Sequence, residues 1–121
     1  MVRKLVILCF TVLMFSACSV QETKENIYIK RLCRHSWQVS TFVNNSINEV
    51  VDVPLVNYKF ETNGILTKTY ENGETHTANW YFSDNLEYLN MGNNTFRIRT
   101  LSSKVLAVSY GEVEIFFVPV N

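Results

Sequence analysis

The chain has 121 residues, and its eleven Lys and Arg residues balance its eleven Asp and Glu residues. This length allows one domain at most beside any targeting segment. A balanced charge gives no support to a nucleic-acid-binding protein, which would need a basic face.

The first residues predict an export signal at 1–17. Arg3 and Lys4 precede the apolar stretch 5–15, and the small residues Ser16 and Ala17 follow it. A basic start, a short apolar stretch and a small-residue exit are typical of secretory signals. The stretch is too short for a membrane-spanning helix, which needs about 20 apolar residues.

The residues Phe15-Ser16-Ala17-Cys18 resemble the lipobox of bacterial lipoproteins. The resemblance implies that the Cys18 thiol takes a diacylglycerol, that cleavage precedes Cys18, and that the new amino group is acylated, for example with palmitate. Two or three acyl chains anchor a protein stably in a membrane. The expected location is the bacterial cell envelope, lipid-anchored to the outer membrane and facing the periplasm or the cell surface. The alternative is a secreted protein cut near Ala17.

Residues 18–26 are then expected to be a polar tether between the anchor and the domain at 27–121. Removing the signal takes Cys9 with it, and Cys18 becomes the attachment point. Cys33 is left alone, which excludes a disulfide framework. We expect Cys33 to be a small packed residue, with a reactive thiol as the alternative.

Residues 25–34 predict a short helix that caps one end of the domain. Tyr28 and Leu32 are four residues apart, as are Ile29 and Cys33, so they form one apolar stripe. The end of this segment is basic: Lys30, Arg31, Arg34 and His35. Basic side chains suit the C-terminal end of the helix dipole, and contact with anionic lipid head groups is the alternative.

From Trp37 onward the apolar residues alternate with polar ones. Eight strands are expected: 37–43, 55–62, 65–71, 74–83, 86–91, 95–101, 104–110 and 113–120. Asn-Gly pairs at 63–64 and 72–73 are strong hairpin signals. Because most connections are short, sequential strands must be antiparallel neighbours. We predict an all-β, eight-stranded antiparallel up-and-down meander that closes into a barrel and so leaves no open edges.

The region 27–121 has Trp37 after a short helix, then the long loop 44–54, an antiparallel meander with Asn-Gly turns, and Trp80 on the fourth strand. In these features it resembles the bacterial lipocalin-like domain family of small lipid-anchored envelope lipoproteins. His35-Ser36-Trp37 stands where lipocalins carry Gly-x-Trp. The family implies a lipocalin-like barrel with Trp37 plugging one end, and binding of a small hydrophobic ligand.

An eight-stranded barrel is either filled by side chains or holds one small ligand. Alternation places large side chains inside, and we expect most of them to form packed core. The candidate ligand-binding residues are Tyr58, Phe60, Trp80 and, in the long loop, Val51. The apolar residues of that loop either cover the core as a lid or contact a ligand or partner.

Nothing in the sequence indicates an enzyme, a metal site or a cofactor. The chain has two histidines, His35 and His76, and lacks a cysteine cluster or a Gly-x-Ser-x-Gly elbow. The function that the lipocalin-like and lipobox resemblances imply is binding of a small hydrophobic ligand by an envelope lipoprotein. The alternative is a protein-interaction or inhibitor module with a solid barrel core.

Overall fold

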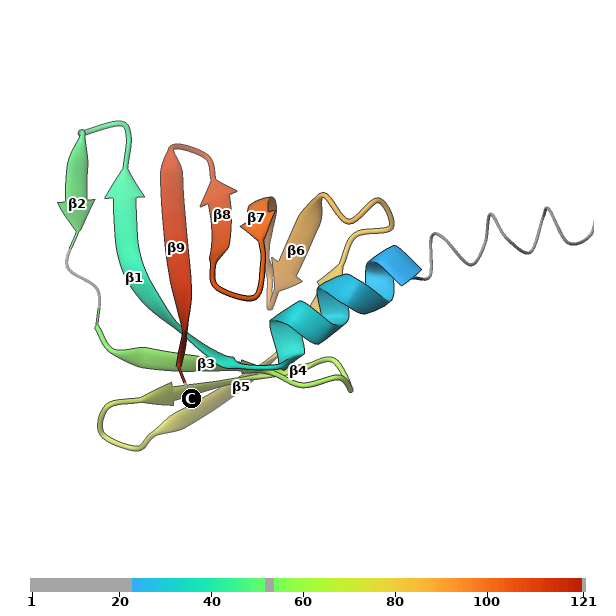
Figure 1. Ribbon diagram of the computed structural model, residues 1–121. Coiled ribbons are helices and arrows are strands. Elements are labelled where there is room, and N and C mark those ends of the chain that lie inside the picture. The colour runs from blue at the N-terminus through green and yellow to red at the C-terminus, as the bar shows by residue number, and fades with distance from the viewer. Residues whose placement is uncertain (1–22, 52–53, 121) are drawn as a thin grey trace, which may run out of the picture.

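The computed structural model describes residues 23–51 and 54–120 (Figure 1). The predicted signal peptide, Cys18 and most of the predicted tether lie outside these residues. In the described part a helix at 23–33 precedes nine strands. The strands are β1 (Ser36–Asn44), β2 (Glu49–Val51), β3 (Val56–Phe60), β4 (Ile65–Tyr70), β5 (Thr75–Phe82), β6 (Tyr88–Met91), β7 (Asn94–Leu101), β8 (Leu106–Tyr110) and β9 (Val113–Val120).

The sheet closes on itself. Each pair of neighbouring strands is antiparallel, and β9 returns to pair with β1 along its whole length, from Ser36↔Val120 to Asn44↔Val113. The ring therefore runs β1-β3-β4-β5-β6-β7-β8-β9, with eight strands. This arrangement confirms the predicted antiparallel barrel, in which closure removes the exposed edges of the meander.

The ninth strand, β2, lies inside the segment that we expected to be a loop. β1 is longer than β3, and only its first part, Ser36–Gln38, pairs with β3. On the same edge, Phe42–Asn44 pairs with β2. β2 thus supplies backbone partners to the part of β1 that β3 does not reach.

A β-bulge in β1 changes which side chains face the interior. The register against β9 shifts between Val39 and Thr41, and a bulge of this kind inserts one extra residue into a strand. Trp37 and Val39 face inward before the bulge, and Phe42 faces inward after it. Strict alternation from Trp37 would have placed Thr41 inside instead.

The Asn-Gly pairs form the predicted hairpins. At the β4–β5 turn, Tyr70 N–H donates to the Glu74 carbonyl (2.8 Å) and Gly73 N–H donates to the Tyr70 carbonyl (2.9 Å). Gly73 has a φ of 86°, whereas Asn72 is not among the residues of positive φ. A type I turn that ends in a left-handed Gly explains this pattern. The Asn72 side chain also accepts from Glu74 N–H (2.9 Å), which is a common role of Asn in turns.

The helix covers one end of the barrel (Figure 1). Leu32 is 0% exposed in the core, and Tyr28, Ile29 and Cys33 pack against that core, so the predicted apolar stripe is confirmed. Trp37 is also fully buried there. No helix in the described residues is both long and apolar enough to cross a membrane.

Candidate functional site

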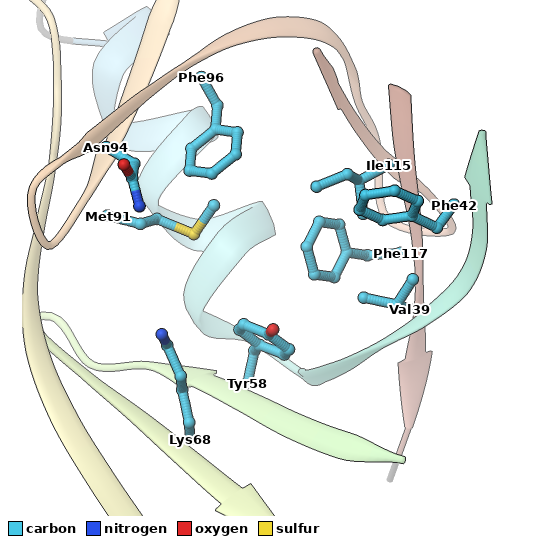
Figure 2. Close-up of a pocket in the computed structure, with 9 residues that line it drawn as sticks. All are labelled: Val39, Phe42, Tyr58, Lys68, Met91, Asn94, Phe96, Ile115 and Phe117. Atoms are coloured by element: carbon cyan, nitrogen blue, oxygen red, sulfur yellow. The ribbon is translucent and has the colours of Figure 1, made fainter. Parts of the chain in front are cut away.

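Large side chains fill the barrel near the helix and leave a pocket beyond them. Phe60 and Trp80 stack edge to face, with ring centroids 5.7 Å apart, in the same core cluster as Leu32 and Trp37. Toward the opposite end lies a partly open pocket of about 160 Å³ (Figure 2). Its lining residues are Val39, Phe42, Tyr58, Lys68, Met91, Asn94, Phe96, Ile115 and Phe117.

One side of the pocket is an apolar wall built by β1 and β9. Val39 pairs directly with Phe117, and Phe42 pairs with Ile115, so the four side chains form one continuous surface. Figure 2 shows them together on one side of the pocket. Such a wall can bury the apolar part of a ligand.

The opposite side carries the polar groups. Figure 2 shows Lys68 and Asn94 there beside Met91, with the amino end of Lys68 pointing into the pocket. Lys68 comes from β4 and Asn94 from the start of β7. The pocket therefore has a polar side and an apolar side, and a bound molecule would be oriented between them.

Tyr58 lies between the two sides. Its ring packs edge to face on Phe117, with centroids 5.2 Å apart, and the Lys68 Nζ lies 6.0 Å from its ring centroid. Burial raises the pKa of the Tyr58 phenol above its ordinary value, and the neighbouring Tyr70 raises it further. The phenol is consequently protonated at neutral pH and has an O–H to donate.

The expected ligand-binding residues lie in different parts of the structure. Tyr58 lines the pocket. Phe60 and Trp80 do not line it but lie in the core nearer the helix, where Trp80 Nε1 donates to the Glu61 carbonyl (2.8 Å). The backbone of Val51 pairs with Phe42, which does line the pocket. A contact of any of these residues with a ligand stays a prediction.

Alternation had not singled out several of the lining residues. The inward orientation of Phe42 depends on the β1 bulge, and no local sequence pattern indicates that bulge. Lys68 carried a usable signal, because it alternates with Leu66 and Tyr70 on one face of the expected third strand. A lysine on an inward face of a barrel strand is unusual enough to mark a site.

The ionisable groups of the described residues are dispersed. His76 contacts Glu74 (3.1 Å) on the exposed surface, whereas His35 stacks on Trp37. Residues 23–51 and 54–120 contain no group of three or more His, Cys, Asp or Glu side chains that would hold a metal ion.

Comparison with solved structures finds proteins of similar fold. The chain is similar to the crystal structure of a lipocalin-like protein from Bacteroides uniformis, with a TM-score of 0.62 and 17% identity over 74% of this chain and 99% of that chain. It is also similar to an uncharacterised protein from Bacteroides eggerthii, with a TM-score of 0.59 and 13% identity over 71% and 98% of the two chains. No protein-family model and no curated protein sequence matches the chain. At these identities the likeness shows a lipocalin-like fold alone.

Proposed function

We propose that this lipocalin-like barrel binds one small apolar molecule in its pocket. The observation that carries the proposal is the partly open pocket of about 160 Å³ with an apolar wall. In another protein, an engineered apolar cavity of about 150 Å³ binds benzene. Pockets for drug-sized ligands measure about 300 to 1,000 Å³. The pocket volume therefore favours a single aromatic ring or a short alkyl chain.

A ligand of this size has few atoms with which to gain affinity. Even the best very small ligands gain at most about 1.5 kcal/mol per non-hydrogen atom, and association has an entropic cost. We expect dissociation constants in the range of about 10 μM to 1 mM for ring-sized probes. Calorimetric titration at high probe concentration is suited to this range.

The test compares a variant that fills the pocket with one that places a phenylalanine on the outer surface. Ile115→Phe enlarges a side chain of the apolar wall, whereas Val118→Phe changes an exposed position of the same strand. Benzyl alcohol should bind the unmodified chain and Val118→Phe, and it should bind Ile115→Phe at least about tenfold more weakly. Equal binding to all three, or none to the unmodified chain, would contradict the proposal.

We further propose that the protein is a cell-envelope lipoprotein anchored through Cys18. The support is the lipobox-like Phe15-Ser16-Ala17-Cys18 after a short apolar stretch. Cys18→Ala should release the protein from the membrane fraction, because the acylated thiol would be lost. Cys33→Ala is the matched control and should leave fractionation unchanged. If Cys18→Ala stays in the membrane fraction to the same extent as the unmodified chain, anchoring through Cys18 is refuted.

A protein-interaction role is the second candidate, and one observation favours it. Ile47 and Val50 are 56% and 72% exposed on the β1–β2 hairpin. Exposed apolar side chains that gather in one region are typical of contact surfaces. Chemical cross-linking in membranes should then capture a partner with the unmodified chain and with Ile115→Phe, but not with Ile47→Ser/Val50→Ser. Loss of capture with Ile115→Phe alone would contradict this role.

A further inference from the structure

The Lys68 ammonium lines the pocket without a carboxylate partner in the part of the chain that the structure describes. The side chain is half-buried, and it lines a pocket whose other members are apolar apart from Tyr58 and Asn94. Within the described residues, no carboxylate lies within ion-pair distance of Lys68. Charged groups that are withdrawn from water are normally paired.

The Tyr58 ring does not take the place of an anion. The distance of 6.0 Å from the Lys68 Nζ to the ring centroid is at the outer limit of a cation–π contact. A lysine ammonium has three donors and no acceptor, and no hydrogen bond from the Lys68 Nζ is formed within residues 23–51 and 54–120. The ammonium thus has donors available on the pocket side.

We propose that the pocket selects small carboxylic acids with an apolar body, and that Lys68 binds the carboxylate. This inference rests on the proposed function, since it names the class of molecule that the pocket takes. The apolar wall covers the body of the ligand. The acid group then lies on the opposite side, where Lys68 and Asn94 line the pocket (Figure 2).

The two other polar groups of the pocket fit the same ligand. Tyr58 retains its O–H at neutral pH and donates it to an anionic oxygen. The side-chain amide of Asn94 also has N–H donors. Hydrogen bonds in which one partner is ionised are about twice as strong as neutral ones. Among the three polar groups, Lys68 is the one that adds an opposite charge, so it provides the main discrimination. An amine of the same size would meet a like charge and would be rejected.

The pocket volume sets the size of the acid. A space of about 160 Å³ accepts one aromatic ring or a chain of several carbons. A long-chain fatty acid would extend out of the pocket. Benzoate, benzyl alcohol and benzylamine are therefore suitable probes, because they share one ring and differ in charge.

The experiment titrates these three probes into the full chain held in zwitterionic nanodiscs, with empty nanodiscs as the blank. Benzoate should bind about tenfold tighter than benzyl alcohol, and benzylamine should bind more weakly than both. Lys68→Met keeps the length of the side chain but removes the charge, so the benzoate preference should disappear while benzyl alcohol still binds. Lys68→Arg should retain the preference.

Lys104→Met is the matched control. It removes the same charge from an exposed turn near the helix end of the barrel and should leave the preference unchanged. Absence of binding by every probe would overturn the proposed function and this inference together. Binding of benzyl alcohol without a preference for benzoate would overturn this inference alone. An unchanged preference in Lys68→Met would also overturn it. If Lys68→Met does not fold, the three probes on the unmodified chain decide the question.

Discussion

The indole of Trp37 joins the helix to the barrel. Its ring is fully buried, and its Nε1–H donates to the Leu32 carbonyl at 2.9 Å. The last carbonyls of a helix have no partners within the helix. A buried carbonyl without a donor is costly, so this contact both fills the end of the barrel and completes the end of the helix.

Trp37→Phe tests the two contributions of this residue. The phenylalanine retains a ring but leaves the Leu32 carbonyl without its donor and opens a small cavity. We expect the free energy of unfolding to fall by about 2 kcal/mol. Tyr81→Phe, at a side chain that is largely exposed, should change it by less than about 0.5 kcal/mol. Urea denaturation measures both, and equal effects of the two changes would contradict the role of Trp37.

At the scale of elements, the helix is held by side-chain hydrogen bonds between it and distant strands. Lys59 of β3 donates to the Cys33 carbonyl at 3.0 Å, and Arg31 donates to the Leu101 carbonyl at the end of β7 at 3.1 Å. The position of Lys59 also matches the preference for a positive charge at the end of a helix. These contacts fix the helix across one opening of the barrel.

Lys59→Met should loosen the helix without opening the barrel. The change removes a charged donor from a helix-end carbonyl, and we expect a loss of about 1 kcal/mol. Hydrogen exchange should accelerate in the amides of the helix at 23–33 more than in those of β3 and β4. Lys30→Met, at an exposed position of the same helix, should leave exchange unchanged. Uniform acceleration throughout the barrel would contradict a local role.

The strands were predictable where local signals define them. Period-two alternation and the Asn-Gly turns placed β3, β4 and β5 within a few residues of their observed bounds. β2 was not predictable, because its pairing depends on β1 being longer than β3, which is a tertiary relation. The bulge that turns Phe42 inward is likewise set by pairing with β9.

At the scale of the whole molecule, the helix determines which end of the barrel holds a pocket. Alternation correctly placed Tyr58, Phe60 and Trp80 on inward faces. It does not indicate which end of the barrel is packed with side chains and which end keeps a pocket. Leu32 and Trp37 occupy the helix end, so Phe60 and Trp80 become core and Tyr58 remains at the pocket. The sequence thus predicted a barrel interior and one lining residue, whereas the pocket itself follows from long-range packing.

The barrel as a whole should lose stability at alkaline pH. Burial raises the pKa of the Cys33 thiol, an effect that Lys59 partly offsets, and burial together with Tyr70 raises the pKa of the Tyr58 phenol. The unfolded chain releases these protons at lower pH than the folded chain does. Because the folded state then binds more protons, the free energy of unfolding falls as pH rises above about 9, first through Cys33 and then through Tyr58.

Two variants separate these contributions. Cys33→Ala should flatten the decline that begins at about pH 9, and Tyr58→Phe should flatten the part above about pH 10. Urea denaturation from pH 7 to about pH 11 measures both, with each variant serving as the control for the other. The tyrosine also links stability to the pocket, since it must remain protonated to donate its O–H. A decline above about pH 10 that is equally steep in Tyr58→Phe and in the unmodified chain would show that this phenol is not held protonated by the fold.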